Sequence, residues 1–183
     1  GITGLETINV WSTMITDVGL ERLTGLTNLK QLTMGGNELG DAGLQALRQM
    51  TGLTYLDLSG RQGTDKNVWT IAMSETGLGA VLALKDLREL RFSCVSIGVG
   101  IEGARLGEIS MLTVTPRWLE QMKSLTKLER LKLQGCGKIG DDAIATLAAM
   151  PALKEVDLQG TSVTAAGAAK LKAAKPNSIV YFG

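Results

Sequence analysis

A repeated hydrophobic frame runs through nearly the whole chain and constrains its fold more than any other feature of the sequence. From a starting apolar residue, apolar or small residues recur five, eight and eleven positions later. The copies of this frame begin at Ile15, Leu39, Met73, Val114, Ile139 and Val163. Each copy follows a shorter segment that opens on a leucine, at positions 5, 29, 53, 87, 128 and 153, and a last partial copy opens at Asn177. A recurring frame of this length predicts a repeat architecture.

Each unit combines two patterns of apolar spacing. In residues 29–50, LKQLTMGGNELGDAGLQALRQM, the apolar residues first alternate, as in a short strand, and then follow helical spacing. One strand–helix unit cannot bury its apolar side alone, so neighbouring units are expected to stack around a shared core. Asp17, Asp41 and Asp141 begin the helical runs, where first-turn carboxylates meet the positive end of a helix.

The units resemble leucine-rich repeats. Their pattern is L-x-x-L-x-L-x-x-[N/C/T]-x-[L/I/V], and the ladder position at the turn after the strand holds Thr13, Asn37, Cys136 and Thr161. The continuations ITDVGLERL, LGDAGLQAL and IGDDAIATL are similar to the ribonuclease-inhibitor-like and cysteine-containing types, in bacterial form. The resemblance implies an α/β fold over residues 1–183: a right-handed solenoid in a horseshoe arc, with a parallel concave sheet, convex helices, six repeats and a terminal strand.

Two insertions interrupt the frame just after the strand of adjacent units. Where the frame allows four residues, the chain has fourteen after Leu58 and twenty-one after Phe92. The additional residues correspond to about 61–72 and 94–113. Extra residues at equivalent points of a repeat protein gather on one face, often the binding face, so the two insertions are expected to form one rim.

The second insertion contains GVGIEG, residues 98–103, which matches the glycine pattern of a dinucleotide-binding turn. The segment lies several residues beyond the strand and does not lead directly into the next helix. A dinucleotide site also requires an open doubly wound sheet with a switch point, whereas a solenoid winds in one direction. We therefore expect these glycines to let a protruding loop turn back, and we expect no cofactor.

The composition argues against most catalytic and metal chemistry. The chain has no histidine, the commonest general base and zinc ligand, and only two cysteines, Cys94 and Cys136. We expect no catalytic residue and no metal ion. We also expect free thiols, because a disulfide needs Cβ atoms within about 4.5 Å and the sequence does not show that these two are so close.

The charge balance and hydropathy bear on the partner and the location. With 19 basic and 18 acidic residues, the chain gives no electrostatic reason to expect a nucleic acid or an anionic membrane as partner. No apolar stretch approaches the roughly 20 residues of a membrane span. These features favour a soluble protein, with export after loss of a leader, or membership of a larger chain, as open alternatives.

Alternating strand positions place three rows of side chains on the concave face of the predicted sheet, and the third holds Trp11, Gly35, Ser59, Ser93, Gln134 and Gln159. From the first unit to the last, the first row is Thr7, Gln31, Tyr55, Glu89, Arg130, Glu155 and Ile179, and the second is Asn9, Thr33, Asp57, Arg91, Lys132, Asp157 and Tyr181. Neighbours in a row lie about 4.8 Å apart, so opposite charges are expected to pair along each row. Two interpretations stay open: mutual neutralisation at about 0–1 kcal/mol a pair, or a polar recognition surface with aromatic anchors.

Leucine-rich repeat domains of this size are usually recognition scaffolds, so the resemblance implies a non-catalytic protein-binding module. The predicted partner-binding residues lie on the concave face and in the insertions: Tyr55, Asp57, Trp69, Arg91, Glu102, Arg105, Arg130 and Lys132. Two alternatives stay open, self-association through the end strands and a small-molecule enzyme with a cleft under the insertions. Trp118, which replaces the glycine or alanine of the other units, is expected to pack under the second insertion, and Trp69 to anchor the first.

Overall fold

The structure, a computed structural model, describes every residue except 1–3, 61, 64–67, 70 and 95–113, and within residues 61–70 it describes only the backbone of a short hairpin. Its main element is a parallel sheet with the strand order β1-β2-β3-β6-β7-β8-β9. The strands are β1 Thr7–Asn9, β2 Gln31–Thr33, β3 Tyr55–Asp57, β6 Glu89–Ser93, β7 Arg130–Gln134, β8 Glu155–Asp157 and β9 Ile179–Tyr181.

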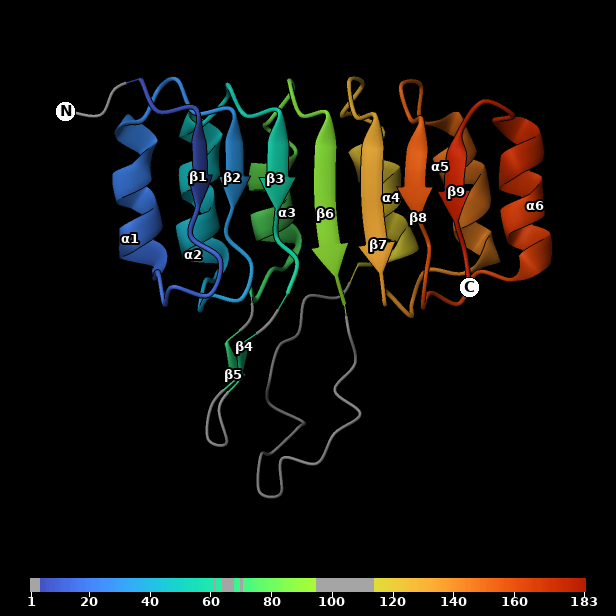
Figure 1. Cartoon of the computed structure of the whole chain (residues 1–183), viewed down its shortest axis with the longest axis horizontal. Helices are drawn as coiled ribbons and strands as arrows, with labels where there is room; N and C mark the ends of the chain where they lie inside the picture. Colours follow the sequence, from blue (N-terminus) through green and yellow to red (C-terminus); the bar gives the residue numbers. More distant parts are fainter. Residues whose placement is uncertain (1–3, 61, 64–67, 70, 95–113) are drawn as a thin grey trace.

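Helices return the chain from the end of one strand to the start of the next, and all of them cover the same side of the sheet (Figure 1). They are α1 Asp17–Arg22, α2 Asp41–Leu44, α3 Glu75–Val81, α4 Pro116–Met122, α5 Ile144–Ala149 and α6 Ala165–Ala174, with short 3₁₀ turns at η1 Leu23–Gly25, η2 Gln45–Gln49 and η3 Asp141–Ala143. The predicted fold is confirmed: the chain winds as a right-handed solenoid, with strands on the concave side and helices on the convex side. We number the units 1 to 6 by the strands β1, β2, β3, β6, β7 and β8 that open them.

The core is a stack of aliphatic side chains that runs along the solenoid between the sheet and the helices. Register pairing aligns Leu32, Leu56, Leu90, Leu131 and Val156 in one row, and each of them is at most 1% exposed. The helices add the apolar residues that the repeat frame predicted, such as Leu44, Leu78 and Leu119, all fully buried. Phe92 and Trp118 also lie in this core, which is otherwise almost entirely aliphatic.

Tight turns follow the strands and depend on glycine and on the ladder residue. Gly36, Gly60, Gly135 and Gly160 all have positive φ angles between 66° and 95°, a region that disfavours a side chain. The fully buried Asn37 accepts hydrogen bonds from the backbone N–H groups of Thr13 and Ile15 at 3.1 Å and donates to the carbonyls of Val10 and Met34 at 2.7 and 2.9 Å. A buried turn of this kind leaves backbone groups without partners, and the amide of Asn37 satisfies them across two units.

The first-turn aspartates bond to the helix of the following unit. Asp41 accepts hydrogen bonds from the N–H groups of Ser74 and Gly77 at 2.9 and 3.0 Å, and Asp141 accepts one from the N–H group of Thr164 at 2.8 Å. Asp17 likewise accepts from the N–H of Gly40 at 3.0 Å. Each carboxylate thus partners N–H groups that the next helix leaves unpaired at its start, and it links two units on the convex side.

These aspartates explain a glycine in the following helix. A Cβ at Gly43, Gly77 or Gly167 would come within 2.2, 2.5 or 2.0 Å of the carboxylate oxygen of the preceding Asp17, Asp41 or Asp141. Units 3 and 4 have Glu75 and Pro116 at the aspartate position, and the units after them have Trp118 and Ala143 in place of the glycine.

The position of Trp118 therefore does not require glycine, because the preceding unit has Glu75 where the others have the aspartate that would contact this position. The Trp118 side chain is buried. The predicted packing of Trp118 under the second insertion involves residues 95–113, outside the described part of the chain.

The two insertions begin at neighbouring strand ends. β3 and β6 are paired in parallel, so the strand ends from which the insertions start lie next to each other at the same end of the sheet (Figure 1). After β3 the backbone forms an antiparallel hairpin of β4 Gln62–Gly63 and β5 Val68–Trp69 before it rejoins the solenoid at Ile71, which bridges to Leu39.

Candidate functional site

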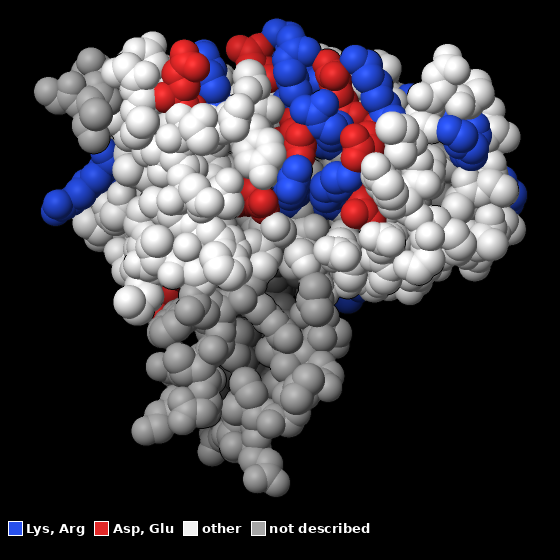
Figure 2. Space-filling model, viewed as in Figure 1, with Lys and Arg blue, Asp and Glu red and all other residues white. Residues whose placement is uncertain are grey.

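The concave face carries the first two predicted rows in the predicted register. Tyr55 lies opposite Glu89, which lies opposite Arg130, and in the second row Arg91 lies between Asp57 and Lys132. The structure thus brings together five of the predicted partner-binding residues on β3, β6 and β7. Figure 2 shows charged side chains gathered on this face over β6, β7 and β8.

Glu89 forms the centre of this face. Its carboxylate accepts hydrogen bonds from the guanidinium groups of Arg91 and Arg130, each at 2.6 Å. The side chain of Glu89 is 7% exposed, whereas those of Arg91 and Arg130 are 40% and 44% exposed. Burial by itself raises the pKa of Glu89, but the hydrogen bonds from Arg130 and Arg91 outweigh it and lower the pKa overall. One recessed carboxylate therefore holds two more exposed cations.

The ion pairs differ in part from those expected along the rows. Glu89 pairs with Arg130 as predicted, but Arg91 bonds to Glu89 on its own strand instead of Asp57. Lys132 bonds diagonally to Glu155 of β8. The physical reason is competition for the aspartates, because the carboxylates of Asp57 and Asp157 accept the backbone N–H groups two residues further on.

Two tyrosine rings lie close to the cations of the second row. The guanidinium carbon of Arg91 lies 5.2 Å from the ring centroid of Tyr55, and Nζ of Lys132 lies 4.6 Å from that of Tyr181. The Tyr55 hydroxyl donates to Asp57 at 3.2 Å, and burial together with the charge of Asp57 raises the pKa of Tyr55. Contacts over an aromatic face add to the ion pairs in fixing these cations.

A second recessed carboxylate lies one step before the strands and was missed among the predicted site residues. Glu129, with a side chain 19% exposed, pairs with Arg88 at 2.7 Å and with Lys154 at 3.0 Å, whose side chains are 55% and 68% exposed. The alternation of charge at positions 88, 129 and 154 was present in the sequence as a further row. It lies just before the strands, which is why the three predicted rows did not include it.

A small hollow opens where the concave face meets the rim. Its volume is about 150 Å³, and it is lined by Ser59, Arg91, Phe92, Ser93, Lys132, Gln134 and Asp157. We call it the rim hollow. Ser59 follows β3, and Ser93 is the last residue of β6. The hollow therefore lies at the roots of both insertions, where they leave the strands.

The predicted contribution of the insertions lies outside the described residues. The structure describes the backbone of Trp69 in β5 but not its side chain, and it does not describe Glu102, Arg105 or the GVGIEG segment. Their parts in partner binding stay predictions.

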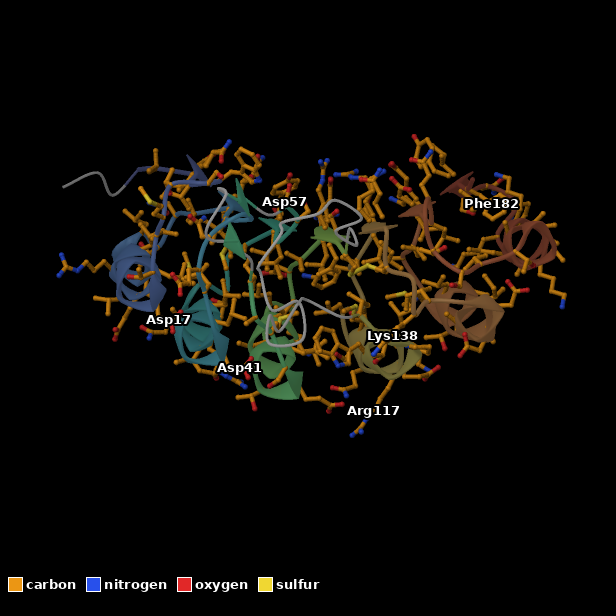
Figure 3. All side chains as sticks on the ribbon, turned by 90° about the horizontal axis from the view of Figure 1, so that it is seen from below. Asp17, Asp41, Asp57, Arg117, Lys138 and Phe182 are labelled. Carbon is orange, nitrogen blue, oxygen red and sulfur yellow. A yellow bond between two sulfur atoms is a disulfide. The ribbon has the colours of Figure 1, made fainter. Side chains whose placement is uncertain are left out.

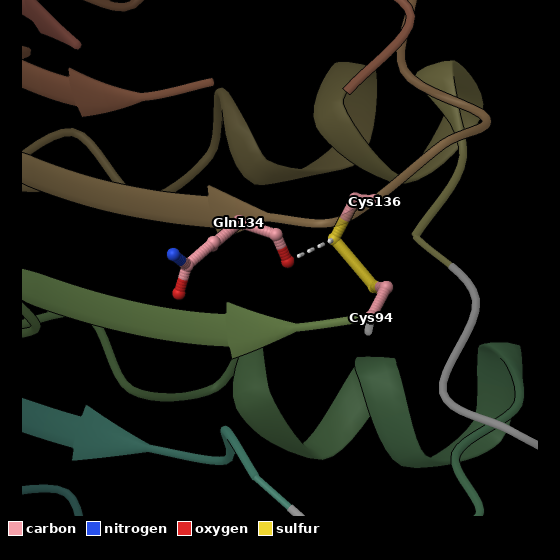
Figure 4. The surroundings of a disulfide bond; sticks show 3 residues. All are labelled: Cys94, Gln134 and Cys136. Carbon is pink, nitrogen blue, oxygen red and sulfur yellow. Dashed lines mark hydrogen bonds between the residues drawn. A yellow bond between two sulfur atoms is a disulfide. The ribbon is translucent and has the colours of Figure 1, made fainter. Parts of the chain in front are cut away.

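The prediction of free thiols is wrong, because Cys94 and Cys136 form a disulfide (Figure 4). Cys94 follows β6 and Cys136 follows β7 just beyond the paired residues Ser93 and Gln134. This parallel register brings the two Cα atoms to 4.6 Å, within the range that a disulfide spans. The bond ties the root of the second insertion to the ladder position of the next unit, where unit 2 has Asn37.

The described part of the chain contains no group of three or more acidic or cysteine side chains placed to hold a metal ion. Across the same residues no helix is long and apolar enough to span a bilayer.

Comparisons with known proteins agree with the repeat architecture. Residues 3–62 and residues 124–148 match family models described as leucine rich repeat. A Caenorhabditis elegans protein named "Putative RNA-binding protein EEED8.10" is 35% identical over 81 residues, which cover 44% of this chain and 9% of that protein.

Among solved structures, the internalin InlF of Listeria monocytogenes aligns with 97% of this chain and 47% of its own, at a TM-score of 0.57 and 20% identity. A TLR13–ssRNA13 complex aligns with 87% of this chain and 19% of its own, at a TM-score of 0.54 and 17% identity. The chain thus spans under half of the internalin and under a tenth of the C. elegans protein. The repeat frame and the two family-model matches identify leucine-rich repeats in residues 3–62 and 124–148, and the solved structures show that the chain has the fold of a leucine-rich repeat solenoid.

Proposed function

We propose that this chain is a protein-binding module that holds its partner against the concave face and the adjoining rim. The observation that carries the proposal is the fixed arrangement of polar groups over β3, β6 and β7, where Glu89 immobilises Arg91 and Arg130. A rigid sheet with side chains already in place reduces the ordering cost of association. Tyr55 and the arginines are also of the residue types enriched in interface hot spots.

The proposed contact surface extends from the sheet into the insertions. Tyr55, Asp57, Arg91, Arg130 and Lys132 would form its centre. Trp69, Glu102 and Arg105 would extend it along the rim, which is supported by the adjacent origins of the two insertions.

The proposal involves no catalytic step. Leucine-rich repeat proteins generally mediate interactions, and the rim hollow, at about 150 Å³, is smaller than the roughly 300–1,000 Å³ of most small-molecule sites. The disulfide supports a location in an oxidising compartment, and thus export, since such bonds persist there and are rare in the cytosol. The ribonuclease-inhibitor-like type and a bacterial origin stay predictions.

Single-stranded RNA is a second candidate partner. It is favoured by the RNA-related names of the C. elegans relative and of the TLR13 complex, and by exposed cations such as Arg88 and Lys154. An RNA contact predicts binding that weakens steeply with salt and that ribonuclease abolishes.

Self-association through the end strands is a further candidate. β1 and β9 are the outer strands of the sheet, and large apolar side chains are exposed near both ends: Trp11, Met14, Val18, Ile179, Tyr181 and Phe182. Unpaired strand edges with apolar neighbours favour pairing with another chain. Light scattering that rises with concentration would support this candidate.

The protein-binding proposal is tested by pull-down with immobilised chain in the presence of ribonuclease. The variant Arg91→Ala/Arg130→Ala removes both exposed guanidinium groups, and we expect it to lose the captured proteins. The matched control, Arg117→Ala/Lys127→Ala, removes two cations that belong to no concave row and pair with Glu75 and Asp86, and Figure 3 shows Arg117 on the helix side. Equal capture by the concave variant, with its fold intact, would exclude this face as the binding site.

A further inference from the structure

We propose that the rim hollow binds a side-chain carboxylate of the protein partner. This inference rests on the proposed function and specifies the chemistry that the concave face recognises. Its occupant would be an aspartate or glutamate in a partner segment that lies across β6 and β7 next to the roots of the insertions.

Two cations on neighbouring strands line the hollow. Arg91 of β6 and Lys132 of β7 are register partners, so their backbones are about 4.8 Å apart. The two oxygens of a carboxylate can accept one hydrogen bond from each cation, and charge-assisted bonds of this type are about twice as strong as neutral ones. Ser59, Ser93 and Gln134 add hydroxyl and amide donors to the same lining.

Both cations are held in place before a partner arrives. Arg91 is fixed by Glu89 and by the ring of Tyr55, and Lys132 is fixed by Glu155 and by the ring of Tyr181. Long cationic side chains otherwise lose considerable rotamer entropy on binding. Their fixed positions favour a ligand with defined geometry, such as a carboxylate.

The aspartates of the second row bond to backbone groups and not to these cations, although Asp157 lines the hollow and the charge of Asp57 acts on Arg91. Asp57 accepts from the backbone N–H of Ser59 at 2.8 Å and from its hydroxyl, and Asp157 accepts from the backbone N–H of Gln159 at 3.0 Å. No ion pair joins either aspartate to Arg91 or Lys132 among the described residues. The carboxylates that do pair with Arg91 and Lys132 are Glu89 and Glu155, which belong to the first row.

The size and charge of the site favour one carboxylate over a larger anion. A hollow of about 150 Å³ has room for a side chain but not for a typical small-molecule ligand. A nucleic-acid backbone would carry further phosphates past Glu155 and Asp157, and the net charge of the chain is only +1. A protein segment can present a single acidic residue with neutral neighbours.

The test begins with a displayed library of random linear peptides selected on the wild-type chain. Peptides that lose binding to Arg91→Ala/Arg130→Ala define the concave-face binders and test the proposed function. In each such peptide the acidic residues are then replaced singly by their amides. We expect one replacement to weaken binding by about tenfold, the effect of losing one charge-assisted contact. With the variant Lys132→Gln, which leaves Arg91 as the one cation of the hollow, the same replacement should have a clearly smaller effect, whereas Lys127→Gln should behave as wild type.

A second variant keeps the test independent of the ion pairs. Ser93→Val narrows the hollow without removing a charge, suits a strand position, and should cause a similar loss. Concave-face binders that tolerate every amide replacement would overturn this inference and leave the proposed function standing. Peptides indifferent to Arg91→Ala/Arg130→Ala would contradict both. Oligouridylate is the competitor that tests a phosphate ligand. If it displaced the peptides at a concentration below their own dissociation constant, and if this displacement required Lys132, the ligand would be a phosphate and the proposed carboxylate would be wrong.

Discussion

The end units and the middle units of the solenoid are joined by different chemistry. Units 1 to 3, and units 5 and 6, are linked on the convex side by Asp17, Asp41 and Asp141, which bond to the next helix. Figure 3 shows Asp17 and Asp41 on the helix side of the molecule, with Asp57 on the sheet side. Unit 4 lacks such an aspartate on both of its sides, because Glu75 and Pro116 occupy the equivalent positions.

The middle units are linked more extensively on the sheet side. β6 and β7 are the longest strands, their ends are joined by the disulfide, and Glu89 and Glu129 bridge cations across them. On the convex side Glu75 contacts Arg117 at 3.2 Å through a more exposed ion pair. The comparison shows that neighbouring repeats can be coupled from either face, and that the strongest coupling through the sheet coincides with the candidate binding surface.

The largest expected effect is loss of the disulfide. The variant Cys94→Ala/Cys136→Ala opens a link between residues 42 positions apart. A closed loop of this length is worth about 4 kcal/mol of unfolding free energy in the chain-entropy description. Denaturant unfolding measures the loss, and hydrogen exchange should locate it in β6 and β7 while β1 and β2 keep their protection. Reduction of the wild-type chain is the control and should give the same midpoint. An unchanged midpoint in both would show that the sheet side is not strengthened by this bond.

Asn37→Ala should be the next largest in effect, at about 3 kcal/mol, because it leaves several buried backbone groups without partners. The measurement is again the free energy of unfolding. Thr161→Ala is the matched change at the same ladder position in unit 6. Its hydroxyl donates one hydrogen bond to the carbonyl of Leu158 at 2.6 Å, so we expect a loss of about 1 kcal/mol. Equal losses of unfolding free energy for the two variants would show that Asn37 stabilises its turn no more than Thr161 does.

Gly167→Ala tests the convex link directly. Alanine normally favours a helix over glycine, but here its Cβ would meet Oδ1 of Asp141 at 2.0 Å. We expect a net loss of about 2 kcal/mol from overpacking. Asp141→Ala should remove the clash, so the double variant should be no less stable than Asp141→Ala alone.

Position 143 supplies the control for Gly167. Its preceding unit has Pro116 instead of aspartate, and Ala143→Gly should cost about 2 kcal/mol, from the helix propensity and from the loss of a fully buried methyl group. If Gly167→Ala stabilised the chain, the proposed dependence of glycine on the preceding aspartate would be wrong.

The smallest effect is expected in the pH dependence of the unfolding free energy at acid pH. Hydrogen bonds from Ser74 and Gly77 outweigh burial and lower the pKa of Asp41, and those from Thr164 lower the pKa of Asp141. A folded pKa below the unfolded value of about 3.9 means that the contribution is complete above that pH and is lost as pH falls through the folded pKa. Asp41→Asn/Asp141→Asn should therefore flatten the decline of unfolding free energy below about pH 4. An identical slope in wild type and variant would show that these carboxylates do not couple protonation to stability.

The candidate site was predictable in outline but not in its pairing. The alternation along each strand predicted which side chains share the concave face, and Tyr55, Asp57, Arg91, Arg130 and Lys132 occupy the expected register. The sequence did not reveal that Arg91 bonds to Glu89, because Asp57 lies equally near in the register and its engagement with Ser59 depends on the local turn. The insertions interrupt the repeat, so no neighbouring unit predicts the positions of Trp69, Glu102 or Arg105.

The sequence by itself determined the winding, the register and the buried spine of this protein. Apolar residues at fixed intervals have only one way to be buried in every unit at once, and that constraint aligns the strands. The tertiary structure decided the links between units: the disulfide of Cys94 with Cys136, the aspartates that reach the following helix, and the cations held over Glu89. Each of these links depends on distances of a few ångströms between side chains that have several possible partners nearby. The repeat period determines which residues are neighbours, but it does not determine which of the neighbours form a bond.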